Sequence, residues 1–202
     1  MDESAKQLLK DKRESLPLQP GQPQRVDYPF EAAGMRKMFL AGEPLAGKRC
    51  VKVTAQRTSE DWAHFLRELV DVHSPKAEQI VLVMDTLNPH TPSAFYSTFA
   101  PSEALRILQK LELHYTPGHG RCLNMAEIEL SALARQCLSR RIGTQEEREC
   151  EVQAWQQRRT EESITVNWRL TTADARIKLK RLYPSLEKKK LSTSKGSVAN
   201  LS

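Results

Sequence analysis

The sequence predicts an α/β fold with a mixed sheet flanked by helices. Residues 35–40 and 49–54 alternate between apolar and polar side chains, as half-buried strands do. Residues 79–84 form a continuous apolar run, which is typical of a central strand. Helical periodicity follows the second and third of these segments, so we expect helices to pack against the sheet.

The first part of the chain is expected to hold a helix, a connector and a hairpin. Residues 2–14 are polar and mildly helical in pattern, and residues 16–23 are too rich in Pro and Gly for a regular element. The two strands 35–40 and 49–54 are joined through turn-forming residues, namely Gly42, Pro44 and Gly47.

The middle of the chain alternates helices and strands. Thr58 and Asp61 have the spacing of a capping box, and the helix that they begin is expected to end before Pro75. After the apolar strand, the pattern predicts helices over 93–99 and 102–111 and a short strand over 112–115.

Further helices are expected toward the C-terminus. The clearest spans 124–141, and Thr144 with Glu147 can begin another that reaches about residue 159, with Trp155 as its anchor. A last helix is expected over residues 172–181. We therefore expect one domain over 1–185, followed by a basic tail over 186–202 that has too few apolar residues to pack.

Composition favours a polyanionic partner in the cytoplasm. The 202 residues include 31 Lys and Arg against 25 Asp and Glu, with a net charge of +6. No apolar run approaches the roughly 18–20 residues of a membrane span. The cysteines, which form no CxxC pair, indicate reduced thiols and give no reason to expect a structural zinc site; they are Cys50, Cys122, Cys137 and Cys150.

Two carboxylates carry the main functional signal. Asp85 directly follows the apolar strand, where open α/β sheets bind ligands, and Glu127 lies near the start of the long helix. Helical spacing places Glu127 toward the core side and Glu129 toward solvent. We expect Asp85, Glu127 and a third carboxylate to hold a divalent metal. Helix capping is the alternative, by Asp85 at a turn and by Asn124 with Glu127 at a helix start.

Other motifs are absent or weak. His90, His114 and His119 flank the proposed site but lack the spacing of a zinc motif, so hydrogen-bonded or surface histidines are expected. The sequence contains no P-loop, no dinucleotide-binding glycine motif and no G-x-S-x-G, which disfavours the enzyme classes that use them.

Three longer segments match the pattern of a known family, and they read VLVMDTLNPHTPSAFY, ELHYTPGHGRCLNMAEIELSALARQCLSRRI and TTADARIKLKRLYPS. These segments resemble the DDE endonucleases, in particular the catalytic domains of bacterial insertion-sequence transposases of the mariner superfamily. The resemblance runs from Asp2 to about residue 185 and implies a ribonuclease H-like fold. It also implies an Asp, Asp and Glu triad that binds two Mg²⁺ or Mn²⁺ ions, here Asp2, Asp85 and Glu127. Residues expected to support this site are Asn88, His90, His119 and Asn124.

The resemblance implies hydrolysis of phosphodiesters at insertion-sequence ends and transfer of the 3′-hydroxyl to target DNA. It also implies DNA as the partner and a homodimer acting on paired ends. Basic residues are candidates for phosphate contacts, although none can be assigned from the sequence; they are Lys48, Arg49, Arg140, Arg141 and residues 188–190.

The sequence departs from the family pattern in three places. Cys122 replaces the usual Trp, and Thr86 replaces the usual Asn. Family members also carry helix-turn-helix segments and an apolar strand before the first Asp, whereas this sequence begins one residue before Asp2. We therefore expect an N-terminally truncated domain whose first central strand is missing, with Asp2 on a frayed terminus and the α-amino charge near the metals.

Such a chain is expected to cut DNA poorly. Two hypotheses remain open at this point: a transposase catalytic domain, or a truncated and inactive remnant that serves as a non-catalytic DNA-binding or assembly module.

Overall fold

The computed structural model describes residues 1–12, 20–21, 29–85, 90–116, 124–178 and 180. The chain divides into two units, Met1–Trp168 and Arg169–Ser202. The second unit contains helix α6 (Thr172–Lys178). The predicted tail over residues 186–202, like the expected end of the last helix at residue 181, lies outside the described residues.

Three antiparallel strands form the larger sheet, in the order β1 (Asp2–Asp11), β2 (Phe30–Glu43) and β3 (Lys48–Thr54). The hairpin of β2 and β3 is confirmed. The helix expected over residues 2–14 is wrong, because β1 pairs along β2 from Asp2 opposite Leu40 to Asp11 opposite Phe30. Pairing with β2 outweighs the mild helical preference of these polar residues.

Two parallel strands, β4 (Ile80–Met84) and β5 (Leu111–Tyr115), form the second sheet. Helices α2 (Ser93–Thr98) and α3 (Pro101–Gln109) connect them. The expectation that β4 is buried on both faces is wrong for the described residues. Leu82 and Met84 are buried, whereas Val81 and Val83 on the other face are 60% and 45% exposed.

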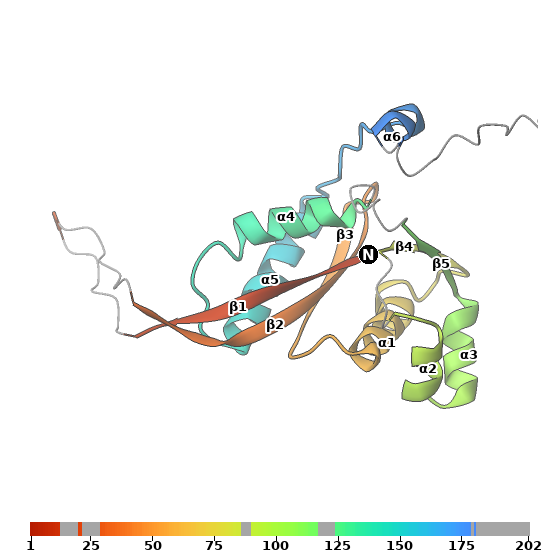
Figure 1. Ribbon diagram of the computed structural model, residues 1–202, viewed down its shortest axis with the longest axis horizontal. Coiled ribbons are helices and arrows are strands. Elements are labelled where there is room, and N and C mark those ends of the chain that lie inside the picture. Colours follow the sequence, from red (N-terminus) through yellow and green to blue (C-terminus); the bar gives the residue numbers. More distant parts are fainter. Residues whose placement is uncertain (13–19, 22–28, 86–89, 117–123, 179, 181–202) are drawn as a thin grey trace, which may run out of the picture. The chain divides into compact units, whose positions relative to one another are not determined.

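The two sheets meet at the N-terminus. The Met1 amino group donates a hydrogen bond of 2.6 Å to the Val83 carbonyl of β4, while Asp2 pairs with β2 (Figure 1). Among the described residues, no strand lies between residues 41–43 of β2 and residues 80–82 of β4. The expectation that the first central strand is missing stays a prediction.

One face of the larger sheet is covered by α1 (Ser59–Glu68), which continues into a π-helical turn, η1 (Leu69–His73). The predicted capping box is confirmed, since Thr58 accepts a hydrogen bond from the Asp61 amide and the Asp61 side chain accepts one from Thr58. The core on this face joins Leu82 and Met84 of β4 to β2 and the helices. Its completely buried residues include Phe39, Trp62, Phe65, Phe95 and Ile107.

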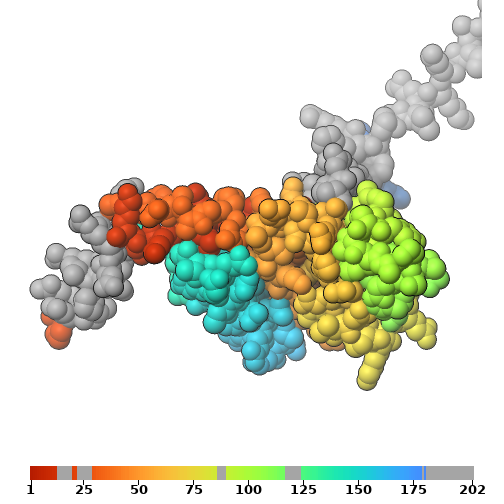
Figure 2. All heavy atoms as spheres, turned by 90° about the horizontal axis from the view of Figure 1, so that it is seen from below, coloured from red at the N-terminus to blue at the C-terminus, as the bar shows by residue number. Residues whose placement is uncertain are grey.

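The other face is covered by α4 (Ala126–Gln136) and α5 (Gln145–Glu161). Figure 2 shows these helices, in green to blue, against the red and orange strands. The predicted cap at Thr144 is confirmed by its bond from the Glu147 amide, and Trp155 is buried as expected. Their core includes Leu40, Val53, Leu133, Val152 and Trp155.

This mixed α/β arrangement, with a small sheet flanked by helices, agrees with the ribonuclease H-like fold expected from the sequence. In the part of the chain that the structure describes, no helix combines the length and apolar character needed to cross a membrane.

Candidate active site

Asp85 lies directly after the C-terminal end of β4, as predicted. Its side chain is buried, and the Thr116 hydroxyl donates to its Oδ1 at 3.3 Å. Thr116 follows β5, and its amide bonds to the Met84 carbonyl, so the parallel pairing of the strands brings this hydroxyl beside Asp85. Thr116 was not identified from the sequence. Its position, one residue beyond the end of a strand that pairs with β4, could have indicated that it lies beside Asp85.

Asp2 is the first residue of β1 and is buried, with 5% of its surface exposed. Its Oδ1 accepts a hydrogen bond of 2.8 Å from the Glu3 amide, and Met1 is held by Val83. The expectation of a frayed terminus is therefore wrong. Pairing with β2 on one side and the bond to β4 on the other fix the first Asp in the structure.

Asp2 and Asp85 meet at one small cavity between β1 and β4. Met1, Glu3, Met84 and His90 complete its lining. These residues come from the two separate sheets. The fold thus brings together two of the three carboxylates that the sequence assigned to a metal.

The charge of the α-amino group also differs from expectation. Burial lowers the pKa of the Met1 amine from 8.0 to about 6, although the neighbouring Asp2 carboxylate raises it in part. The amine is therefore mainly neutral at pH 7. It does not place the expected full positive charge beside Asp2.

Asn124 connects the start of α4 to the start of β1. Its Nδ2 donates to the Met1 carbonyl at 2.8 Å, and its Oδ1 accepts from the Ala126 amide at 3.1 Å. The N-cap of α4 is Met125, so the expected N-cap at Asn124 is one residue too early. Asn124 instead accepts a bond from the first helical amide and links the start of α4 to Met1. Glu127 lies in the first turn of this anchored helix and is half-buried.

Glu129, rather than Glu127, points into the core. It is buried, and its carboxylate lies 3.1 Å from Arg49 of β3 and 3.0 Å from Arg159 of α5. The predicted orientation of these two glutamates is therefore wrong. The buried arginines come from other elements, so the periodicity of α4 alone could not show that the polar position faces the interior.

His90 is buried near the same cavity. Its ring stacks on Trp62, with ring centroids 5.2 Å apart, and its Nε2 lies 3.6 Å from a Glu3 carboxylate oxygen. Burial, and secondarily the charge of Arg57, lowers the pKa of His90 to about 4. His90 is thus neutral at pH 7 and lines the cavity as a packed, non-ionised side chain.

Glu3 is a second residue that sequence reasoning did not place at the site. It is buried, and its Oε1 lies 2.8 Å from Arg57. The sequence signal that could have placed Glu3 in the interior is the alternation of side chains along a strand, because Glu3 must face the side of β1 opposite to Asp2. Its ion pair and its contact with His90 support the cavity from the α1 side.

Most of the remaining sequence candidates are paired or lie outside the described residues, and Lys48 is exposed. Arg49, one of the candidates for a phosphate contact, is buried against Glu129, which disfavours that role. Arg140 pairs with Glu151, and Arg141 pairs with Asp11. Outside the described residues lie Asn88, His119 and residues 188–190.

The donor set at the cavity suits a hard divalent cation. Carboxylate oxygens are the ligands that Mg²⁺ and Mn²⁺ prefer, and Asp2 and Asp85 supply them at a buried, narrow position. Among described residues, a tighter cluster with all ligand atoms within 4.8 Å lies elsewhere, at Cys50, Glu68 and His73. In the described part of the chain, Asp2, Asp85 and Glu127 do not form such a cluster, and Glu127 is not among the residues that line the cavity.

Comparison with known families agrees with the resemblance in the sequence. A family model described as DDE superfamily endonuclease matches residues 1–148. The chain belongs to the DDE superfamily endonucleases, whose substrate is DNA and which generally use divalent metals. No curated protein and no solved structure matches the chain.

Proposed function

We propose that the chain is a transposase catalytic domain that cleaves DNA phosphodiesters and transfers strands at the ends of a bacterial insertion sequence of the mariner superfamily. The observation that carries this proposal is the shared cavity of Asp2 and Asp85, beside which Asn124 anchors the helix of Glu127. Membership of the DDE superfamily endonucleases supports the same reaction class.

In the proposed site, Asp2, Asp85 and Glu127 hold two Mg²⁺ or Mn²⁺ ions. Such ions activate a water or 3′-hydroxyl and stabilise the leaving oxygen of an in-line displacement. The three carboxylates bind in their ionised form, so no side chain needs to act as a nucleophile. Thr116 orients Asp85 through its hydroxyl, and Asn124 fixes the first turn of α4.

The burial of Asp2 favours an active domain over an inactive remnant. Weak activity was expected because the first ligand was thought to lie on a frayed terminus, yet Asp2 is 5% exposed and paired with β2. We further propose that two copies act on paired insertion-sequence ends, as the family resemblance implies.

A plasmid-nicking assay tests this function. The purified chain should convert supercoiled DNA to the nicked form with Mn²⁺, and Asp85→Asn and Glu127→Gln should each abolish the conversion. Glu112→Gln is the matched control, since Glu112 is an exposed carboxylate on β5 away from the cavity. Absence of nicking by the wild-type chain, or nicking that persists in Asp85→Asn, would overturn the proposal.

A further inference from the structure

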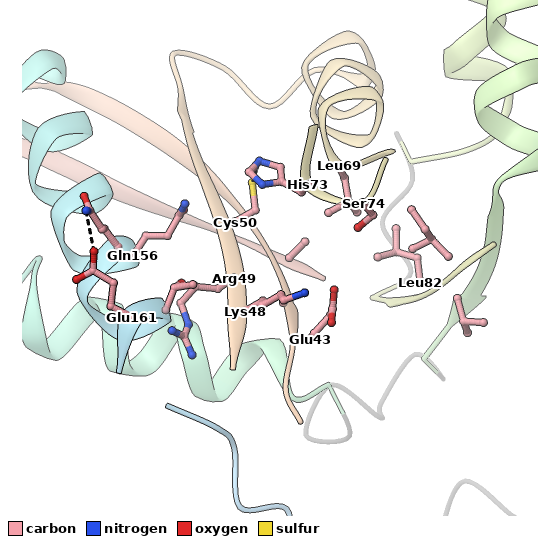
Figure 3. Close-up of a pocket in the computed structure, with 16 residues that line it drawn as sticks. Glu43, Lys48, Arg49, Cys50, Leu69, His73, Ser74, Leu82, Gln156 and Glu161 are labelled. Atoms are coloured by element: carbon pink, nitrogen blue, oxygen red, sulfur yellow. Dashed lines mark hydrogen bonds between the residues drawn. The ribbon is translucent and has the colours of Figure 1, made fainter. Parts of the chain in front are cut away.

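A groove of about 400 Å³ lies between the β2–β3 hairpin and the segment that joins η1 to β4 (Figure 3). Cys50 of β3 and His73 of η1 both line it, and Figure 3 shows their side chains directed toward one another. This groove is separate from the cavity of Asp2 and Asp85, whose lining residues it does not share.

The π-helical turn explains why Glu68 and His73 lie on one side. His73 lies five positions after Glu68. In an α-helix, residues with this spacing point about 140° apart, because each residue turns about 100°. In a π-helix, five positions make roughly one turn, so the two side chains come together. The structure has this uncommon turn at Leu69–His73, directly after Glu68.

Cys50 completes the cluster from the neighbouring strand. Its Sγ lies 2.9 Å from the His73 Nε2, and this nitrogen lies 3.8 Å from the Glu68 Oε1. All three ligand atoms lie within 4.8 Å of one another. A tetrahedral zinc with ordinary bond lengths separates such atoms by about 3.3–3.6 Å. The contact of Cys50 with His73 would therefore lengthen, and that of His73 with Glu68 would shorten, each by roughly half an ångström.

Lys52 holds the other oxygen of the same carboxylate. Its Nζ lies 2.5 Å from the Glu68 Oε2, which leaves Oε1 directed toward His73. Carboxylates that bind metals are commonly oriented by such an outer contact. The ion pair therefore orients Glu68 and leaves one of its oxygens available as a ligand.

We propose that Cys50, Glu68 and His73 form a site for a thiophilic divalent cation of the Zn²⁺ class, with a fourth position open to the groove. One thiolate, one imidazole and one carboxylate suit Zn²⁺, whereas Mg²⁺ prefers oxygen ligands alone. Bound there, the ion joins β3 to the end of the α1–η1 helix. This site is independent of the proposed DNA cleavage, since it uses none of the residues assigned to that reaction.

Cobalt titration of the full chain tests the proposal. Co²⁺ should give the near-ultraviolet absorption of one cobalt–thiolate bond per chain. Equimolar Zn²⁺ should remove this absorption, and excess Mg²⁺ should not. Cys50→Ser should abolish it, and His73→Gln, which changes a partly exposed side chain, should weaken Co²⁺ binding by about tenfold or more.

Two controls separate this site from the rest of the chain. Cys137→Ser removes another buried thiol, and Asp85→Asn removes a ligand of the proposed cleavage site; both should retain the Co²⁺ absorption. Circular dichroism confirms that each variant is folded. A wild-type chain without thiolate absorption, absorption that survives in Cys50→Ser, or unchanged affinity in folded His73→Gln would each overturn the proposal.

Discussion

The Glu129 carboxylate of α4 lies 3.1 Å from the Nε of Arg49 on β3, in the interior of the domain. Arg159 of α5 reaches the same carboxylate at 3.0 Å, and all three side chains are buried. This arrangement connects the sheet with both helices that cover it. It also holds α4, which carries Glu127 in its first turn, against the strands.

Glu129→Gln should lower the free energy of unfolding by about 3 kcal/mol, because two buried guanidinium groups lose their only acidic partner in this cluster. Glu127→Gln, on the same helix but half-buried, should change it by less than about 1 kcal/mol while abolishing DNA nicking. Urea unfolding of the two variants measures the difference. Equal stability of the two would contradict the structural role of Glu129.

The stability of the domain should rise with pH between about 4 and 6.5 through His90. Its folded-state pKa is lowered from 6.5 to about 4, so only the unfolded state binds the proton in this range. This contribution, about 3 kcal/mol, is complete above pH 6.5 and lost as pH falls to about 4. Glu3, Arg57 and Trp62 surround the ring.

Denaturant unfolding of His90→Gln at several pH values tests this prediction. Below pH 6.5, the free energy of unfolding of this variant should depend less steeply on pH than that of the wild type. The Met1 amine, whose pKa is lowered to about 6, changes the stability at higher pH, between about 6 and 8, in both the wild type and the variant. His64→Gln, a change at a more exposed histidine, should leave the slope unchanged. An unchanged slope in His90→Gln would show that the buried ring does not control it.

Gly47→Ala should destabilise the domain more than Gly21→Ala. Both glycines have positive φ, +66° and +78°, so each alanine should cost about 1–2 kcal/mol. At Gly47, a new Cβ would also lie 2.8 Å from the Ser163 carbonyl carbon, whereas nothing lies within 4 Å at Gly21. Thermal unfolding of both variants gives the comparison, and equal losses would exclude the close contact as a cause.

Local features were predictable from the sequence because their causes are local. The capping boxes and caps at Thr58 and Thr144, the β2–β3 hairpin and the position of Asp85 after a strand all depend on neighbouring residues. From β2 onward, the order of strands and helices followed from these patterns, whereas β1 was expected to be a helix. Asp2 and Asp85 were placed by resemblance to a family, and the structure brings them to one cavity.

Features that depend on distant partners were not predictable. Residues 2–14 lack strong strand character, and β1 forms because β2 offers a partner. Glu129 is buried because Arg49 and Arg159 arrive from other elements. The Cys50, Glu68 and His73 cluster has no sequence spacing to reveal it, since its geometry depends on a π-helical turn beside β3.

The most direct test of the central claim, that Asp85 binds the catalytic metal, replaces one ligand atom. Asp85→Cys should abolish DNA nicking in Mg²⁺, because a thiolate is a poor ligand for this ion, and should regain activity in Mn²⁺, which accepts sulfur more readily. The wild-type chain should nick DNA with either ion. Equal loss of activity in both metals, with the fold retained, would contradict the account.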